Sequence, residues 1–292
     1  MLQCKSCYQN LGTKYVMNRR TFLCFPEFKE KALTLSYDDG VIYDKRLVEI
    51  FKKYNLKATF NLNSGNYGNK TYKRMTKQEC VDLFKDSGME VAAHGYKHLS
   101  LATVDSASAI YDVITDRKEL ENTFQRIIKG FAYASGSYDD KVIEILQNCG
   151  ISYSRTIVQT YDFELPNSWY EWHTTCHHEY PNLMDLADRF ISSKRPERDL
   201  DYTPKLMYVW GHSYEFNNND NWFIIEKFAE FIGNREDIYY ATNCEIYDYV
   251  TAYDNLVWSV DNSIIQNKSA IDVYINYYGE KRIIKAGQTI KL

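Results

Sequence analysis

Short apolar segments alternate with segments of helical periodicity along most of this chain, and this alternation restricts the fold more than any other feature. Apolar patterns typical of buried strands predict strands over 31–36, 57–62, 89–94, 130–133, 151–156, 205–212 and 238–242. Apolar residues at helical spacing predict helices over 43–54, 76–85, 105–128, 138–147, 183–193, 221–232 and 243–254. Repeated strand–helix units place parallel strands side by side through right-handed crossovers. The predicted fold class is therefore α/β, with a closed or nearly closed barrel whose ligands bind at the carboxyl ends of the strands.

The pattern changes near Val257. From there apolar and polar residues alternate with a period of two, interrupted by turn-forming residues, so we expect a small C-terminal antiparallel β appendage. Residues 1–30 carry no pattern that predicts an element. The sequence thus predicts an N-terminal extension over 1–30, a barrel domain over 31–256 and the appendage over 257–292.

The charge balance argues against several classes of protein. Thirty-five Lys and Arg against 39 Asp and Glu leave a net charge of -4. No block of like charge could follow a phosphate backbone, so nucleic acid is not an expected partner. The chain has no apolar run of membrane-spanning length, and its start lacks the basic-then-apolar order of a secretory signal. We expect a cytoplasmic protein without a membrane segment, or a secreted one if a leader is missing from this sequence.

The cysteines do not predict a structural role. They number 7 and are scattered, which favours reduced thiols over a disulfide framework. Cys4 and Cys7 have the spacing of metal ligands, but no second pair accompanies them, so ordinary thiols are expected there rather than a structural zinc site.

Titratable side chains follow three of the predicted strands, where a barrel would bring them together. Asp38 and Asp39 end the first strand, His94 and His98 follow the third, and His212 follows a late one. Two imidazoles and a carboxylate suit a divalent transition metal and leave positions open for water and substrate. The second carboxylate is then placed to take a proton from the attacking water, and His212 to protonate the leaving group.

Each of these residues also has a structural explanation. Asp-Asp-Gly after a strand commonly forms a turn. The spacing of His94 and His98 arises by chance or in a helix cap, and a single histidine such as His212 is often part of a hydrogen-bonded core. Their joint position after alternating strands favours the metal hydrolase.

At these residues the sequence resembles the polysaccharide deacetylase family, the NodB-like carbohydrate esterase family 4. Residues 36–40, Ser-Tyr-Asp-Asp-Gly, resemble its Thr-Phe-Asp-Asp-Gly motif, and residues 94–98 resemble its His-Ser/Thr-x-x-His motif. The likeness covers about residues 30–245. It implies a distorted (β/α) barrel of NodB-like type that uses a divalent ion to remove N- or O-acetyl groups from an acetylated saccharide. Zinc is the ion that the resemblance implies, with cobalt, nickel or manganese as alternatives. The implied roles are general base for Asp38, metal ligands for Asp39, His94 and His98, and general acid for His212.

The third motif of the family, Arg-x-Pro-x-Gly, is altered. It aligns with residues 132–136, Ala-Tyr-Ala-Ser-Gly, so the arginine that orients the base is missing. Ser135 still offers the backbone N–H that this family directs at the oxyanion, because that role needs no particular side chain. Without a cation the charged form of Asp38 is favoured less. Our hypothesis is that Arg155, at the end of the next predicted strand, takes the place of the missing arginine.

The fourth motif, Asp-x-x-Asp-Trp, is absent as written. Residues 159–180 are instead rich in aromatic residues and histidines. Trp169 and Trp172, together with Tyr133, are candidates for stacking on sugar rings, although indoles that anchor a packed loop explain the two tryptophans equally well. The histidines at 173, 177 and 178 are open to a metal-binding or a hydrogen-bonding role. The acid that partners His212 is not assigned, and Glu215 is a polar residue near the predicted site without a role.

The sequence thus predicts a divalent-metal-dependent hydrolase that removes acetyl groups from a saccharide. Two alternatives remain open at this point. One is an amidase that uses the same scaffold on a small non-sugar amide, and the other is a carbohydrate-binding protein whose chemistry has weakened.

Overall fold

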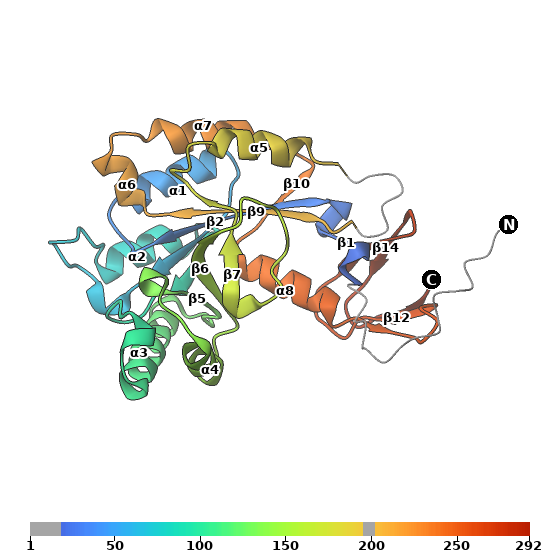
Figure 1. The fold of residues 1–292 in the computed structure, drawn as a ribbon, viewed down its shortest axis with the longest axis horizontal. Helices are drawn as coiled ribbons and strands as arrows, with labels where there is room; N and C mark the ends of the chain where they lie inside the picture. The colour runs from blue at the N-terminus through green and yellow to red at the C-terminus, as the bar shows by residue number, and fades with distance from the viewer. Residues whose placement is uncertain (1–18, 195–201) are drawn as a thin grey trace.

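A parallel β-barrel with helices around it forms most of the molecule (Figure 1). The computed structural model describes residues 19–194 and 202–292. The order of neighbouring strands is β7-β6-β5-β4-β3-β2-β9-β8, and all of these pairs are parallel. The strands are β2 (Lys31–Asp38), β3 (Ala58–Leu62), β4 (Glu90–Ala93), β5 (Gly130–Ala132), β6 (Tyr153–Gln159), β7 (Trp172–Thr174), β8 (Cys176–His177) and β9 (Lys205–Gly211). The predicted α/β barrel is confirmed.

The segment that closes the barrel was not predicted. Only Thr175 separates β7, which pairs with β6, from β8, which pairs with β9, so one short stretch of chain joins both ends of the sheet. The amide of Thr175 donates to the carbonyl of Tyr208 on β9, at 2.8 Å. The sequence of this stretch, Trp-His-Thr-Thr-Cys-His, lacks the apolar run that marks the other strands. Its pairing depends on its two neighbours rather than on its own composition.

The two faces of each strand differ because side chains alternate along it. On β2, Leu33, Leu35 and Tyr37 point outward and pack under the helices, whereas Thr34 and Ser36 point into the barrel. This division explains why the helices bury an apolar layer while the barrel interior holds polar side chains. Asp38 ends the inward-facing row.

Most helices lie at the positions that the helical spacing of apolar residues predicts. In Figure 1, α1, α5 and α7 cover one side of the barrel, and α2, α3 and α4 lie on the other. Thr76 and Glu79 form the capping box with which α2 begins. The 105–128 prediction ends early, because Gln125 adopts a left-handed backbone after Phe124. Helix α6 was not predicted. The helices are α1 (Asp44–Lys53), α2 (Lys77–Phe84), α3 (Ser106–Phe124), α4 (Asp140–Asn148), α5 (Leu183–Ser192), α6 (Ser213–Asn218), α7 (Phe223–Ile232) and α8 (Asn243–Asp254).

Helix α8 fills the amino-terminal end of the barrel. Its first residue, Asn243, accepts a hydrogen bond from Thr34 at 2.7 Å and donates to the hydroxyl of Tyr208 at 2.5 Å, while its amide donates to Thr59 at 2.9 Å. Strand β10 (Ile238–Tyr240) leads into this helix and pairs with the first half of β2. Because this end is filled, the carboxyl ends of the strands are the open end of the barrel.

The C-terminal appendage is antiparallel, as predicted. One sheet has the order β11-β12-β15 and the other β1-β13-β14. The second contains β1 from the predicted N-terminal extension, so residues before the barrel contribute to the appendage. The strands are β1 (Leu23–Cys24), β11 (Val257–Trp258), β12 (Ile264–Gln266), β13 (Val273–Tyr277), β14 (Glu280–Ile284) and β15 (Thr289–Lys291). Cys4 and Cys7 lie outside the described residues.

Short 3-10 helices occupy several connections, at Arg19–Phe22, Pro26–Phe28, Ser64–Asn66, Leu101–Thr103, Ala134–Gly136 and Trp169–Glu171. Among the described residues, no helix combines the length and the apolarity that a membrane crossing requires.

Candidate active site

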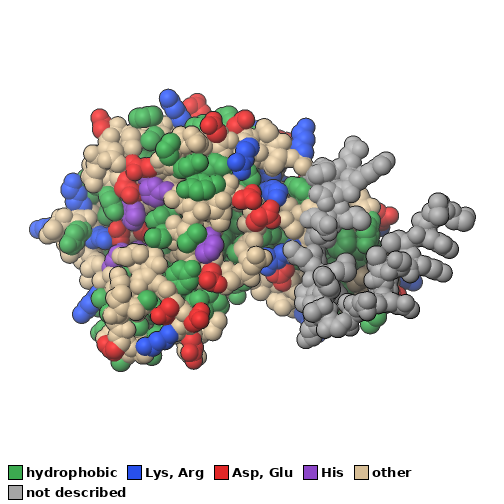
Figure 2. Space-filling view, in the orientation of Figure 1, with side chains coloured by type: hydrophobic (Ala, Val, Ile, Leu, Met, Phe, Trp, Pro, Cys, Tyr) green, Lys and Arg blue, Asp and Glu red, His purple; other side chains and the backbone are tan. Residues whose placement is uncertain are grey.

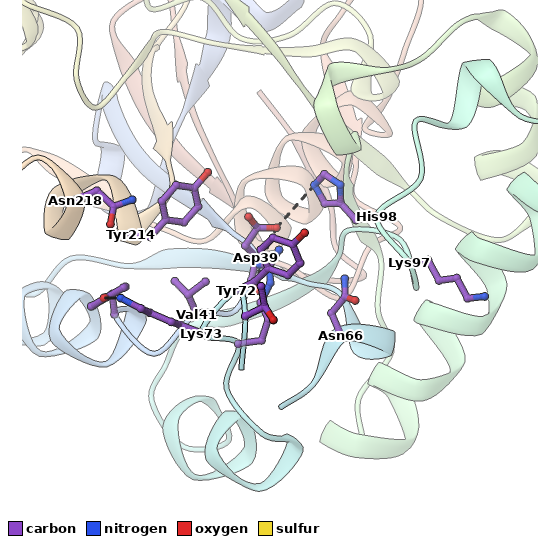
Figure 3. A pocket seen from close by; sticks show the side chains of 12 residues that line it. Asp39, Val41, Asn66, Tyr72, Lys73, Lys97, His98, Tyr214 and Asn218 are labelled. Carbon is purple, nitrogen blue, oxygen red and sulfur yellow. Dashed lines mark hydrogen bonds and ion pairs between the residues drawn. The ribbon is translucent and has the colours of Figure 1, made fainter. Parts of the chain in front are cut away.

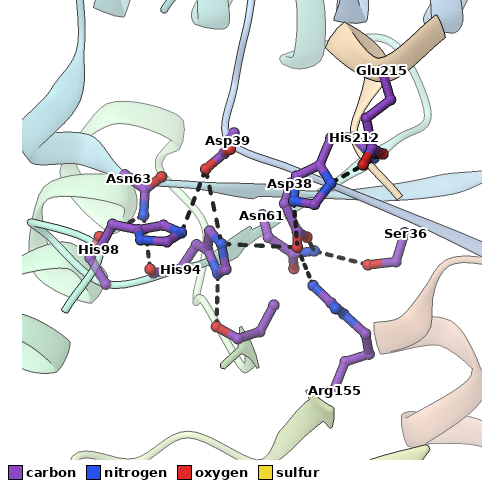
Figure 4. Close-up of polar contacts among 12 residues, drawn as sticks. Ser36, Asp38, Asp39, Asn61, Asn63, His94, His98, Arg155, His212 and Glu215 are labelled. Carbon is purple, nitrogen blue, oxygen red and sulfur yellow. Dashed lines mark hydrogen bonds and ion pairs between the residues drawn. The ribbon is translucent and has the colours of Figure 1, made fainter. Parts of the chain in front are cut away.

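Five predicted residues meet at the open end of the barrel (Figure 4). Asp38 and Asp39 come from the end of β2, His94 follows β4, Arg155 lies on β6 and His212 follows β9. Parallel strands deliver their carboxyl ends to one edge, which is why residues more than 100 positions apart come together. The structure therefore brings together the residues that the sequence singled out by their strand ends.

Asp39, His94 and His98 form a group with the donor set of a metal site. Their candidate ligand atoms all lie within 4.8 Å of one another. The Nε2 atoms of His94 and His98 are 3.9 and 3.8 Å from Oδ1 of Asp39. Nδ1 of His94 donates to the carbonyl of Ala132 at 2.8 Å, so in the neutral ring the lone pair is on Nε2, which faces Asp39. Burial lowers the pKa of His94 to about 4 despite the neighbouring carboxylates, which keeps the ring neutral. These residues fit a divalent cation.

Two buried carboxylates on α3 hold the loop that carries the histidines. Asp116 accepts hydrogen bonds from the amide of His94 at 3.0 Å and from the hydroxyl of Ser64 at 2.6 Å. Asp112 accepts from the amide of Lys97 at 2.7 Å. Sequence reasoning missed both, although acids four residues apart on the apolar face of a predicted helix are a signal that such a role exists. They fix the direction in which His94 leaves its strand.

Unusual backbone conformations cluster at the site. Asp39, His98 and Ser135 have positive φ angles of 89°, 58° and 56°, which side-chain-bearing residues adopt at a cost of about 1–3 kcal/mol where the fold imposes them. Gly95 has φ 84°, and a Cβ there would lie 2.4 Å from Oδ2 of Asp112, so only glycine fits. Arg74 forms an ion pair with Asp39 at 2.8 Å. The loops are held in these conformations by their contacts.

The guanidinium of Arg155 contacts the carboxylate of Asp38. Both side chains are almost fully buried, and Nη2 of Arg155 donates to Oδ2 of Asp38. Asn61 donates to the other oxygen at 2.7 Å. Burial by itself raises the pKa of Asp38, but the charge and the hydrogen bond of Arg155, with a contribution from His212, outweigh it and hold the pKa well below its usual range. The structure thus places a cation directly beside the Asp38 carboxylate.

Arg155→Ala is expected to lower turnover on the order of 100-fold with the metal still bound, because Asp38 loses the group that orients it. The pKa of Asp38 should rise, so the rate should fall first at acidic pH and recover in part as the pH increases. Breaking a buried ion pair also costs about 3–5 kcal/mol of stability, so Arg155→Lys, which keeps a cation, is the matched control. Turnover from pH 4 to 9, metal content and melting temperature are measured on each. Unchanged turnover in folded Arg155→Ala would discard the assignment.

His212 has a carboxylate partner that the sequence left unassigned. Its Nδ1 lies 3.1 Å from Oε2 of Glu215, and its amide donates to the same oxygen at 2.9 Å. Nε2 points toward Asp38 and lies 3.9 Å from Oδ2. Burial by itself lowers the pKa of His212, but Glu215 and then Asp38 outweigh it and raise the pKa. The available signal was the three-residue spacing, since α6 begins directly after His212.

The predicted aromatic contacts do not fit the structure. Trp172 and Tyr133 are each 1% exposed, so their rings cannot stack on a sugar. Trp172 packs against Tyr208 inside the barrel, at 5.1 Å between ring centroids. Trp169 packs against Trp172 and against Tyr247 of α8, near the closed end of the barrel. Trp172 and Tyr133 are therefore core residues, and Trp169 is a partly buried ring that packs against the core. His173 also takes no part in the metal group and hydrogen-bonds Thr156 at 2.8 Å.

A cleft lies beside the metal group instead (Figure 3). Its volume is about 660 Å³, and Asp39 and His98 lie in its wall. Figure 3 shows the rings of Tyr72 and Tyr214 beside Asp39. Histidine side chains reach the surface among acidic ones on this side of the molecule (Figure 2). A substrate in the cleft therefore meets aromatic rings and the metal group together.

Comparisons with known proteins agree with the fold and the motifs. A model of the polysaccharide deacetylase family matches residues 26–154. A chitin deacetylase of Colletotrichum lindemuthianum is 31% identical over 101 residues, which are 34% of this chain and 38% of that relative's length. The carbohydrate esterase domain of a multidomain xylanase from the hindgut metagenome of Trinervitermes trinervoides shares the fold. It has a TM-score of 0.50 at 14% identity, over 76% of this chain and 92% of that one.

A carbohydrate esterase family 4 pseudoenzyme from Bacillus anthracis is also similar, at 20% identity and a TM-score of 0.46, over 74% of this chain and 65% of that one. None of these comparisons supports the expected cytoplasmic location. The family model covers the segment that carries both the Asp-Asp-Gly and the His-x-x-x-His motifs. In these motifs, this match and the barrel that surrounds them, the chain is similar to the NodB-like polysaccharide deacetylase family.

Proposed function

We propose that this protein is a divalent-metal-dependent deacetylase that removes acetyl groups from a saccharide. The observation that carries the proposal is the contact between Arg155 and Asp38. It supplies, from a different strand, the cation that the altered third motif lacks. With it, the site combines a candidate metal-binding group, a carboxylate whose pKa is lowered and a histidine whose pKa is raised. This complement of groups supports catalysis over carbohydrate binding alone.

The surroundings of the base and the acid shift their pKa values in opposite directions. Arg155 lowers the pKa of Asp38, which is proposed to take the proton of the water that attacks the acetyl carbonyl. Glu215 raises the pKa of His212, which favours the protonated ring, and His212 is proposed to give a proton to the leaving amine or alkoxide from Nε2. Asp39, His94 and His98 would hold the divalent cation, which when bound supplies positive charge that polarises the carbonyl. The amide of Ser135, in the 3-10 helix Ala134–Gly136 that follows β5, is proposed to donate to the developing oxyanion.

The cleft supports a saccharide rather than a small amide as substrate. Its volume of about 660 Å³ is within the range of pockets that enclose ligands much larger than an acetyl group. Tyr72 and Tyr214 present aromatic faces that suit a sugar ring. Lys73 and Asn66 offer hydrogen-bond donors in the same wall.

Acetate release tests the proposal. Protein loaded with zinc, cobalt, nickel or manganese is incubated with N-acetylglucosamine oligomers, an acetylated xylan and a small non-sugar acetamide, and acetate is quantified. Metal-stripped protein is the control. We expect metal-dependent release from a saccharide. Release from the acetamide alone would favour the amidase alternative, and no release even from an activated acetyl ester would contradict the enzymatic function.

A further inference from the structure

Three imidazoles surround one oxygen of Glu215. Oε2 of Glu215 lies 3.1 Å from Nδ1 of His212, 3.2 Å from Nε2 of His177 and 3.3 Å from Nε2 of His178. The two additional histidines come from the end of β8, the segment that closes the barrel. The proposed acid His212 is therefore linked through Glu215 to a second element of the fold.

The tautomer of His177 follows from its other contact. The amide of Glu179 donates to Nδ1 of His177 at 3.2 Å, so Nδ1 is an acceptor. In a neutral imidazole the proton is then on Nε2, the atom that faces Glu215. The ring is held in place by its edge-on packing with Trp210, at 4.9 Å between centroids. His177 is thus a hydrogen-bond donor to the carboxylate.

This tautomer decides between two explanations of the cluster. His177, His212 and Glu215 are close enough to hold a metal ion. A metal there would need the lone pair of Nε2 of His177, which is available only if the ring proton moves to Nδ1. That proton would face the amide proton of Glu179, and the hydrogen bond would be lost. The geometry favours a hydrogen-bonded group over a second metal site.

His178 contributes packing rather than a hydrogen bond. Its ring stacks on Phe216 at 4.0 Å between centroids, and neither of its nitrogens makes a hydrogen bond of good geometry. Burial lowers the pKa of His178 well below its usual value, so this ring is neutral. Space for it comes from Gly211, where a Cβ would lie 2.0 Å from Nδ1 of His178. Of the two histidines, His177 is the one that can act on Glu215.

We propose that His177 is a positioning residue that acts through Glu215 on His212. Its Nε2–H donates a hydrogen bond that fixes the Glu215 carboxylate and stabilises its negative charge. Glu215 then holds Nδ1 of His212, so that Nε2 keeps facing Asp38. The catalytic consequence rests on the proposed function, whereas the hydrogen-bond arrangement does not. The charged and titratable groups that face His212 are Asp38 and Asp39 from β2, Arg155 through its contact with Asp38, His177 and His178 from the β8 segment, and Tyr214 and Glu215 from α6.

His177→Phe and His177→Gln test the proposal. Phe keeps a planar ring without a donor, whereas Gln offers an N–H to Glu215. His173→Phe is the matched control, because His173 is a partly buried histidine bonded to Thr156 and not to Glu215. Each zinc-loaded variant is labelled with ¹⁵N-histidine, and long-range ¹H–¹⁵N spectra are recorded from pH 5 to 9. These spectra report the tautomer of His177 and the titration of His212 without any substrate.

We expect His177 in the Nε2–H form in the unmodified protein. In His177→Phe, Glu215 has one donor fewer, so His212 should titrate about half a pH unit or more higher. If the protein releases acetate, kcat should fall several-fold with little change in KM, and the alkaline limb of the pH profile should shift in the same direction. His177→Gln should restore the values, and His173→Phe should leave them unchanged.

An Nδ1–H tautomer at His177, or an unchanged titration of His212 in His177→Phe, would overturn the proposal. So would a zinc titration that removes the Nε2 proton of His177, because it would show a metal between these residues. Absence of acetate release together with the expected spectra would instead contradict the proposed function alone.

Discussion

Asp38→Asn is expected to lower acetate release about 10²–10⁴-fold, the usual contribution of a general base, while the divalent ion stays bound. The variant loses the carboxylate that would take a proton from water, but none of the three metal-binding side chains. The amide oxygen replaces only one of the two acceptors, Oδ1 toward Asn61 and Oδ2 toward Arg155, so the variant should lose some stability, and its melting temperature is compared with that of the unmodified protein. Acetate release and metal content are measured on the same preparation.

Asp39→Asn is the matched control for that experiment, since it differs by one position and removes a charged metal-binding group. It should lose metal as well as activity. Metal loss in Asp38→Asn with metal retained in Asp39→Asn would reverse the two assignments. Full activity of metal-loaded Asp38→Asn would show that the base lies elsewhere.

His98→Ala is expected to weaken metal binding on the order of 100-fold or more, because it removes one of three protein ligands. His98 is 31% exposed, so its removal should cost little stability, in contrast to His94, which is buried. Metal content after dialysis against a weak chelator, and the affinity for zinc from competition with a dye, measure the effect. His173→Ala removes a histidine outside the group and should leave the affinity unchanged. Intact metal binding in both His98→Ala and His94→Ala would place the ion at another site.

The local patterns of the sequence predicted most of the barrel. Apolar periodicity identifies a strand or a helix wherever the element packs on one apolar layer, as β2 and α1 do. The convergence of Asp38, His94 and His212 then follows from the parallel topology alone. The residues that hold this geometry were harder to find, because Asp112 and Asp116 act through backbone amides of a distant loop.

The remaining differences have physical reasons of their own. The 172–177 segment is a strand only because β6 and β9 offer unpaired edges on its two sides. Aromatic residues suggested sugar contacts, yet a large ring such as Trp172 gains more from burial in a core. Arg155 was inferred from a missing charge rather than from any pattern, and that reasoning led to a residue that does contact Asp38.

The acid half of the site is connected, through His177, to the seam of the barrel, where β7 and β8 close the sheet. Two short strands, each held by one neighbour, meet there, and His177 is their last residue. A local opening of this seam would separate His177 from Glu215 while β2, β3 and β4 stay paired around the cation ligands. We therefore expect proton donation by His212 to be lost when the barrel opens locally between β7 and β8, even though the metal ion stays bound. Metal content alone would then not show whether a preparation of the protein is active.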